Sequence, residues 1–323
     1  MFDYEQLFQH QINAWPLAAT NYQALAQITS RTFRLDDILI RVHYNPGRMA
    51  SSSANLSATV IQQRPCFLCA QNRPVEQESL TVPGDTRFQL LVNPFPVFPR
   101  HYTIAADHQP QSIVGNIGTF LHLVRIMNDC VVFYNGPRCG ASAPDHLHFQ
   151  AGNKGFIPVE TDFPNWKTNH TNLLIRQKEA QVSQLNSFIR GGWLLEGTDE
   201  TLLTTWLNDL LEAMQSAQTI PEEEPMINLL SWFDNGSWVI LIFPRKAHRP
   251  ACYTYPEDKK RLISPASVEM GGLIVAARSD DFERITETDL RTIYTEVSLS
   301  DADVALRSAL FVVKQNLYPK KNR

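Results

Sequence analysis

Two histidines and a glutamine at alternate positions are the residues of this chain best suited to chemistry. His146, His148 and Gln150 stand at positions i, i+2 and i+4 of one short segment. Successive side chains of a β-strand point to opposite faces, so all three are expected to line one face of an extended segment. The Gly- and Ser-containing stretch 140–144 precedes them and allows a ligand to approach the backbone closely. One imidazole could attack a phosphorus atom while the carboxamide holds the phosphoryl oxygens.

A second group of residues has the types and spacing of a metal site. Cys66 and Cys69 form a Cys-x-x-Cys knuckle, which can offer two thiolates to one tetrahedral zinc ion. Redox dithiols, buried thiol pairs and sites that have lost their metal share this spacing. The two further ligands that zinc needs are expected to be His108 and His146. Four protein ligands leave no open position, so the zinc would be structural and would anchor the strand that presents His148.

Composition limits the classes of function. The chain has 323 residues and a net charge of -4, which argues against a nucleic-acid or membrane-surface partner. Its first thirty residues contain no long apolar run, so neither a signal peptide nor a membrane span is expected. Five cysteines in a chain of this length do not make a disulfide framework. A reducing cytoplasm is the expected location.

The elements that must position these residues follow from apolar periodicity. An amphipathic stripe predicts a helix over 200–216, and near-continuous apolar runs around Asn235-Gly236 predict a buried hairpin of 226–232 and 238–243. In the first half, we expect helical segments at 2–30 and 112–129 and an extended segment at 32–43. Strands are expected at 87–93, 101–106 and 130–135.

A loose internal duplication is also visible. Strand, turn and strand followed by His-x-Pro occur at 90–110 and again at 229–250. The His-x-His pair is missing from the second copy, so only the first half is expected to carry chemistry. The predicted organisation is an extension over 1–55, a catalytic half over 56–198 and a degenerate half over 199–323.

These motifs together resemble the histidine-triad superfamily. The branch concerned contains galactose-1-phosphate uridylyltransferase, diadenosine tetraphosphate phosphorylase and GDP-L-galactose phosphorylase. Cys66-x-x-Cys69, Asp107-His108 and His146-x-His148-x-Gln150 match its zinc and nucleophile pattern in order and at similar spacing. The resemblance implies an α+β fold of two histidine-triad-like halves, each an antiparallel β-sheet flanked by helices. The similarity is good over 60–155 and loose over 226–316.

The resemblance implies ping-pong nucleotidyl transfer. His148 would attack the α-phosphorus of a nucleotide sugar or dinucleoside polyphosphate, with Gln150 on the non-bridging oxygens and a backbone carbonyl near residue 139 or 140 fixing the tautomer of His148. A phosphate or sugar phosphate would then accept the nucleotidyl group. Neutral donors and cations expected to contact phosphate or acceptor are Asn135, Ser142, Arg48 (which opens the polar loop 48–53), Arg245 and Lys246.

Two departures leave the substrate open. Leu147 stands where the uridylyltransferases have Pro, and Asp145 separates Pro144 from His146. The expected enzyme is a GDP- or UDP-hexose phosphorylase or a hexose-1-phosphate nucleotidyltransferase. A diadenosine tetraphosphate phosphorylase or hydrolase and a zinc-stabilised, non-catalytic nucleotide-binding protein are the alternatives. The chain is expected to be a monomer or a homodimer.

Overall fold

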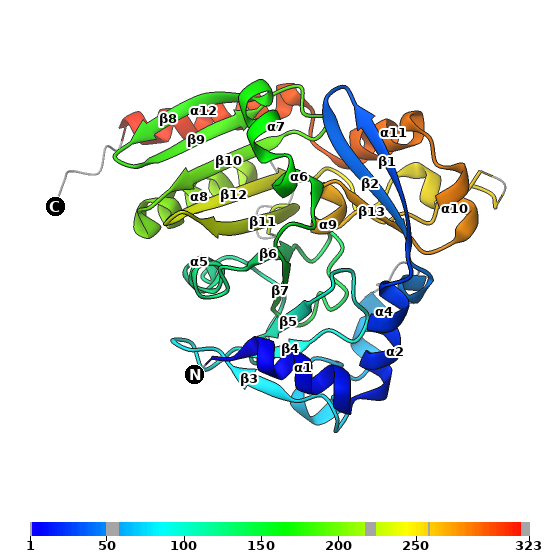
Figure 1. The fold of residues 1–323 in the computed structure, drawn as a ribbon. Coiled ribbons are helices and arrows are strands. Elements are labelled where there is room, and N and C mark those ends of the chain that lie inside the picture. The colour runs from blue at the N-terminus through cyan, green and yellow to red at the C-terminus, as the bar shows by residue number, and fades with distance from the viewer. Residues whose placement is uncertain (1, 50–57, 217–223, 258, 318–323) are drawn as a thin grey trace.

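The computed structural model describes residues 2–49, 58–216, 224–257 and 259–317. Within these residues, ten antiparallel strands form one continuous sheet that runs through the whole molecule (Figure 1). In spatial order the strands are β3 (Ser79–Thr81), β4 (Gln89–Val92), β5 (His101–Ala105), β7 (His148–Asn153), β6 (Cys130–Asn135), β11 (Ile227–Asp234), β12 (Ser237–Pro244), β10 (Gly192–Gly197), β9 (Ala180–Leu185) and β8 (Thr171–Gln177).

The sheet consists of two halves with the same topology. In the first, the chain passes through β3, β4 and β5, then helix α5 (Ile117–Ile126), then β6 and β7. In the second it passes through β8, β9 and β10, then α8 (Glu200–Gln215), then β11 and β12. The spatial orders β3-β4-β5-β7-β6 and β8-β9-β10-β12-β11 are equivalent, and β6 pairs with β11 at the centre. The expected α+β fold of two antiparallel halves flanked by helices is therefore confirmed.

This topology corrects the expected alignment of the duplication. Segment 90–110, with β4 and β5, corresponds in order to β9 and β10, whereas the sequence comparison had matched it to β11 and β12. Strand β7 corresponds instead to β12, whose residues Ser237–Pro244 include neither His nor Gln. The boundaries 1–55, 56–198 and 199–323 stay a prediction. Because β10 pairs with β12, β9 with β10 and β8 with β9, strand pairing favours a second half that begins before residue 171.

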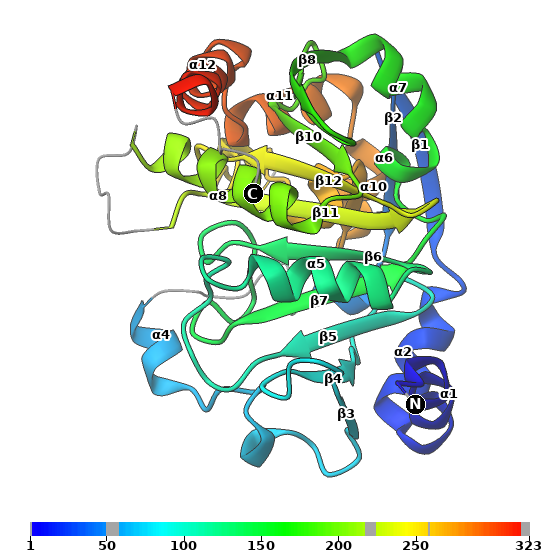
Figure 2. The same ribbon diagram turned by 90° about the vertical axis from the view of Figure 1, so that its left-hand side faces the viewer.

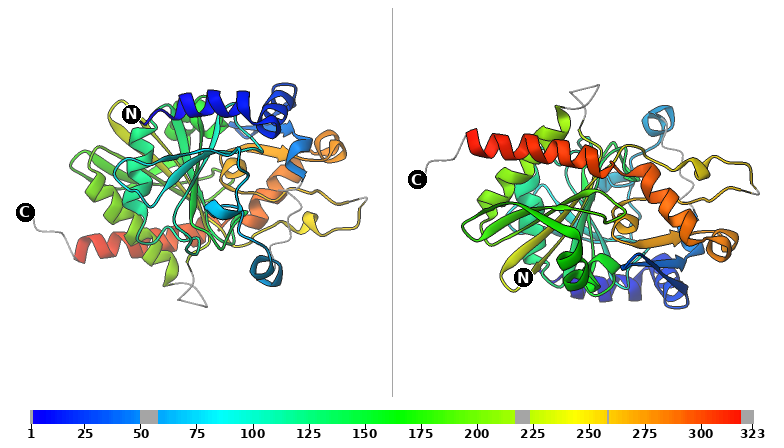
Figure 3. Two further views of the ribbon diagram at one scale, coloured as in Figure 1. Left: turned by 90° about the horizontal axis from the view of Figure 1, so that it is seen from below. Right: turned by 90° about the horizontal axis from the view of Figure 1, so that it is seen from above.

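Different layers cover the two faces of the sheet. Helices α5 and α8 cover one face, with α12 (Asp301–Leu317) packed against α8 and the β8–β9 hairpin (Figures 2 and 3). The other face packs against a three-stranded sheet in the order β1-β2-β13 and against short helices. The bounds are β1 (Thr29–Leu35), β2 (Ile38–Tyr44), β13 (Leu273–Ala276), α6 (Pro158–Thr161), α7 (Phe163–His170), α9 (Ser267–Met270), α10 (Ser279–Arg284) and α11 (Glu287–Val297).

The remaining helices are short and lie before β6. They are α1 (Tyr4–Ala14), α2 (Pro16–Leu25), α4 (Ala58–Gln63) and the 3₁₀ turns η1 (Pro46–Arg48) and η2 (Ala70–Asn72), and a further turn, η3 (Ala251–Tyr253), follows β12. No helix among the described residues is both long enough and apolar enough to cross a membrane.

Local sequence explains most of the element boundaries. The predicted helix over 2–30 is divided because Pro16 begins a new helix at its first turn. The predicted extended segment 32–43 is part of a hairpin that turns at Asp36, whose φ is 59°. Helix α8 begins after Asp199, whose carboxylate accepts a hydrogen bond from the backbone N–H of Leu202. The β11–β12 hairpin turns at Asn235-Gly236, both with positive φ, as expected.

Candidate active site and metal cluster

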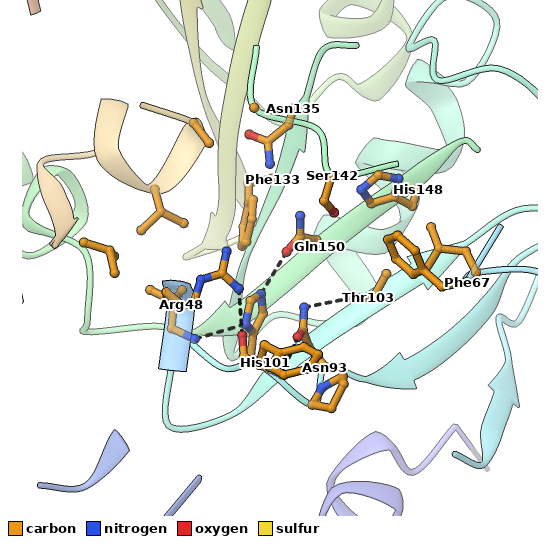
Figure 4. A pocket seen from close by; sticks show the side chains of 18 of the residues that line it. Arg48, Phe67, Asn93, His101, Thr103, Phe133, Asn135, Ser142, His148 and Gln150 are labelled. Carbon is orange, nitrogen blue, oxygen red and sulfur yellow. Dashed lines mark hydrogen bonds between the residues drawn. The ribbon is translucent and has the colours of Figure 1, made fainter. Parts of the chain in front are cut away.

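A pocket of about 460 Å³ lies where the strand ends of the first half meet loops of the second half (Figure 4). The first half contributes Asn135, Ser142, His148 and Gln150, which come from β6, β7 and the loop between them. The second half contributes Ser264 and Glu269, which flank the start of α9. The pocket thus brings together the four expected catalytic and phosphate-binding residues of the first half.

His148 is the first residue of β7 and is held in one tautomer. Its Nδ1 lies 2.8 Å from the backbone carbonyl oxygen of His146. A carbonyl can only accept, so Nδ1 carries the proton and Nε2 keeps its lone pair. The ring is 2% exposed, and burial lowers the pKa of His148 to about 4. The imidazole is therefore a neutral base with a free nucleophilic nitrogen. The carbonyl expected near residue 139 or 140 is in fact that of His146.

His146 does not share the face of His148 and Gln150. Strand β7 begins only at His148, and His146 lies in the bend before it. His148 and Gln150 line the pocket, as expected from alternation along a strand. The His146 ring instead points to the cysteines and His108. The expectation that all three side chains line one face was wrong for His146, because the strand is shorter than the motif.

A buried histidine fixes the orientation of the Gln150 carboxamide. The backbone N–H of Val97 donates to Nδ1 of His101 at 3.2 Å, so the proton of this ring is on Nε2. Nε2 then donates to Oε1 of Gln150 at 3.0 Å. With its oxygen occupied, Gln150 turns its NH₂ group into the pocket (Figure 4). Burial lowers the pKa of His101 to about 3, so this ring is neutral as well.

The carboxamide of Asn135 is fixed in the same way from the other half. Its Oδ1 accepts from Nδ2 of Asn228 at 3.0 Å and from the backbone N–H of Ser267 at 2.8 Å. Because its oxygen accepts these two hydrogen bonds, the NH₂ group of Asn135 points toward the pocket (Figure 4). Two amide donors, on Asn135 and Gln150, therefore face the space beside His148.

Gln111 was not expected from the sequence, yet it holds the strands at the site. The β6–β7 ladder extends to the pair Phe133 and Gln150. Beyond it, the buried Gln111 carboxamide lies between the strands. Its Nε2 donates to the carbonyls of Asn135 and His148 at 2.8 and 3.1 Å, and its Oε1 accepts from the backbone N–H of His148 at 2.8 Å. The side chain acts as an extra peptide group that spaces the two residues.

The three expected cations have different positions. Arg48 ends the turn η1, lines the pocket and donates from Nη1 to the carbonyl of Phe95 at 2.8 Å, while the loop residues 50–53 after it lie outside the described residues. Lys246 is exposed on the surface, away from the pocket walls. Arg245 is buried behind the wall, and the geometry does not support its expected contact with phosphate.

The guanidinium of Arg245 is fully used inside the protein. Its Nε donates to the carbonyl of Val297, and its Nη1 donates to Oδ1 of Asn228 and to the carbonyl of Pro265. Its Nη2 donates to the carbonyls of Ala247 and His248. All five N–H donors thus have protein acceptors.

Cys66, Cys69, His108 and His146 form a cluster that could hold a metal ion. Their ligand atoms all lie within 4.8 Å of one another. Sγ of Cys66 and Nδ1 of His146 are 3.2 Å apart, as are Sγ of Cys69 and Nδ1 of His108. A tetrahedral zinc with Zn–S near 2.3 Å and Zn–N near 2.0 Å sets its ligands at about this separation.

Further contacts prepare the cluster for a metal. Nε2 of His146 donates to the carbonyl of Ala106 at 2.7 Å, which leaves Nδ1 unprotonated for coordination. Arg64 and Asp145 form a salt bridge of 2.6 Å that joins the knuckle to the segment before His146. Two thiols and two imidazoles in this arrangement fit zinc best among common biological metals.

Comparisons with known proteins divide the chain into the same two parts. Residues 7–153 match the model of a domain of unknown function, DUF4922, and residues 164–306 match the model "GDPGP1-like, C-terminal domain". GDP-L-galactose phosphorylase 2 of Arabidopsis thaliana is 25% identical over 167 residues, which are 49% of this chain. The matched region spans only 34% of the length of that relative.

Solved structures confirm the fold. Yeast Ap4A phosphorylase superposes with a TM-score of 0.61 at 19% identity, over 91% of this chain and 97% of the yeast chain. The same yeast enzyme in complex with Ap4A gives 0.59 at 18% identity, over 89% and 97%. The C-terminal part of the chain is thus similar to the GDPGP1-like domain, and the chain has the fold of the yeast Ap4A phosphorylase structure. The resemblance to the histidine-triad branch with these phosphorylases is confirmed.

Proposed function

Because the chain shares the fold and motifs of the histidine-triad phosphorylases, we propose that it is a nucleotidyltransferase with His148 as its nucleophile. One observation carries the proposal. A neutral imidazole with its Nδ1–H bound to a carbonyl faces a pocket into which two carboxamides present NH₂ groups. The nitrogen is free to attack, and the donors suit an anionic, phosphate-like transition state.

In the first step, Nε2 of His148 forms a bond to the α-phosphorus of the donor. The bond from that phosphorus to the bridging oxygen breaks, and the sugar phosphate of a nucleotide sugar, or the nucleoside triphosphate of a dinucleoside tetraphosphate, leaves with the electron pair. Gln150 and Asn135 donate to the non-bridging oxygens without adding negative charge. In the second step, an oxygen of phosphate or sugar phosphate attacks phosphorus, and the P–N bond breaks to restore neutral His148. Ser142 and Arg48 are proposed to contact the same phosphates.

We propose that the donor is a nucleotide sugar, a GDP- or UDP-hexose. The similarity of the chain to a GDP-L-galactose phosphorylase and to the GDPGP1-like domain supports this class. The structural likeness to yeast Ap4A phosphorylase supports a dinucleoside polyphosphate as the second candidate. Both candidates use the same attack on an α-phosphorus, so the base and the second half of the donor distinguish them.

We also propose that Cys66, Cys69, His108 and His146 hold a structural zinc ion. When bound, the ion supplies a rigid cross-link between the knuckle and the segment before β7. His146 then links the two sites, because its ring faces the cysteines while its carbonyl holds Nδ1 of His148. The free thiols of all five cysteines suit a reducing compartment such as the cytoplasm.

Intact-protein mass spectrometry at neutral pH tests the function, because a phosphoramidate is labile to acid. The protein is mixed in turn with GDP-hexoses, UDP-hexoses and Ap4A without acceptor. We expect a mass gain of one nucleoside monophosphate, which is absent in His148→Ala and present in the control His122→Ala. His122 lies on α5 outside the pocket, is half-buried and contacts the carbonyl of Pro83. A wild-type protein that gains no mass with any donor would contradict the mechanism.

A further inference from the structure

A chain of buried hydrogen bonds connects the second half of the molecule to the pocket. Nη1 of Arg245 donates to Oδ1 of Asn228 at 2.5 Å. Nδ2 of Asn228 donates to Oδ1 of Asn135 at 3.0 Å. The three side chains are at most 5% exposed, so water does not compete for these bonds. Asn228 and Asn135 are also direct partners in the β6–β11 register.

The direction of every bond in this chain is determined by Arg245. A guanidinium has donors only, so the Asn228 atom facing it must be the oxygen. The NH₂ group of Asn228 must then face Oδ1 of Asn135 and the carbonyl of Cys139, which it contacts at 2.8 Å. A flipped Asn228 would set NH₂ against guanidinium and oxygen against carbonyl, leaving buried polar groups unpaired.

The first residue of α9 adds a second donor from the same half. The backbone N–H of Ser267 lies 2.8 Å from Oδ1 of Asn135. Gly140 allows this approach, because a Cβ atom at that position would lie 2.5 Å from Cβ of Ala266. Gly140 therefore provides room for the other half, and it also lines the pocket, where the sequence had suggested room for a ligand.

We infer that Asn228 and Arg245 are positioning residues, through which the second half keeps the NH₂ group of Asn135 directed at the reacting phosphate. This inference rests on the proposed nucleotidyl transfer. Neither residue lines the pocket, so both act only through Asn135. The second half lacks its own nucleophile but completes the site of the first.

The substitution Asn228→Asp tests the inference with almost no change in shape. A carboxylate keeps the bond to Arg245 but cannot donate, so it attracts the NH₂ group of Asn135 and turns Oδ1 toward the phosphate. We expect the rate of nucleotidyl-His148 formation at saturating donor to fall about 100-fold, the effect of losing one oxyanion donor. The unfolding midpoint is measured in parallel.

A double-substitution cycle separates positioning from general damage. If Asn228 acts through Asn135, Asn228→Asp has no further effect on the rate in an Asn135→Ala background. Independent, multiplying effects of the two substitutions would overturn the inference. The control is Ser231→Ala, on the same strand and fully buried, whose hydroxyl bonds to the carbonyl of Val239. It is expected to lower stability while the rate stays unchanged.

Two outcomes keep the proposals distinct. If wild-type protein forms no adduct, the proposed function fails and the inference fails with it. If wild type reacts and Asn228→Asp reacts at the same rate, only the inference fails. Should Asn228→Asp not fold, Asn228→Ala replaces it in the cycle. It leaves the Ser267 N–H alone on Asn135, so the expected loss is about tenfold, that of one hydrogen bond.

Discussion

At the scale of single residues, charge at position 150 separates a phosphate contact from a structural role. In Gln150→Glu, Nε2–H of His101 can still donate to one carboxylate oxygen, so the packing is kept. The other carboxylate oxygen then points into the pocket, in the place of the NH₂ group of the wild-type Gln150. Repulsion of the phosphate should slow nucleotidyl-His148 formation by at least about 100-fold.

The measurement is the single-turnover rate of adduct formation, with the unfolding midpoint as control. Gln150→Met, which has a similar length and no charge, should lose less rate than Gln150→Glu. Equal losses in the two variants would contradict the charge argument and assign the effect to the NH₂ donor that both variants lack.

Two buried histidines predict how stability depends on pH. Burial lowers the pKa of His101 to about 3 and that of His43 to about 4, against an unfolded value near 6.5. Below pH 6.5, the two histidines therefore bind protons in the unfolded chain but remain neutral in the folded chain. Stability should fall as pH drops from about 6.5 toward 4, by up to about 1.4 kcal/mol per pH unit for each group.

Denaturant unfolding at pH 7.5, 6 and 5 measures this slope. Replacement of His43 by Leu should reduce the pH dependence of the unfolding free energy by the contribution of that one histidine. An unchanged slope in this variant would mean that His43 is protonated in the folded protein.

At the scale of elements, the sequence predicted the parts with strong periodicity or fixed spacing. Strand β6, helix α8 and the β11–β12 hairpin lie within a residue or two of their predicted positions, because apolar patterns and Asn235-Gly236 are local signals. Strands β8 to β10 were missed. The half-buried residues of Thr171–Gln177 give no clear alternation, and the short, buried run of β10 has no periodicity that marks it as a strand.

The same contrast holds within the site. His148, Gln150 and the Cys/His cluster were visible as motifs, whereas Gln111 and His101 were not. Each of the latter acts through contacts with residues 24 to 49 positions away, and single polar residues between apolar strands resemble ordinary surface. Arg245 was misjudged for the reverse reason, because cations near a pocket resemble phosphate ligands until their acceptors are known.

The metal cluster is an element whose removal should affect two properties together. Nδ1 of His148 bonds to the carbonyl of His146, the residue whose ring also faces Cys66 and Cys69. Chelation, or Cys66→Ser, should therefore lower the unfolding midpoint and slow adduct formation. The control is Cys252→Ser, outside the cluster.

Native mass spectrometry should find about one zinc ion per chain, lost in Cys66→Ser and retained in Cys252→Ser. A metal-free protein that forms the adduct at the full rate would show that the cluster does not position His148.

At the scale of the whole molecule, the two halves share a sheet and both cores. Strand β6 pairs with β11, and the core on the helical face includes Phe149 of the first half and Leu229 of the second. Separation would expose two central strand edges and both apolar faces. We therefore expect the halves to unfold as one cooperative unit, although each has the topology of a complete smaller domain.

The chain offers a separate probe for each half. Five of its six tryptophans follow residue 160, so fluorescence reports mainly on the second half, while reactivity of the Cys66 and Cys69 thiols reports on the first. Both probes should give the same denaturant midpoint after metal removal. A thiol transition at lower denaturant concentration would mean that the first half unfolds alone. The hydrogen bond between Asn135 and Asn228 would then be too weak to make the two halves unfold together. Coincident transitions would show that the pairing which completes the site also makes the fold cooperative.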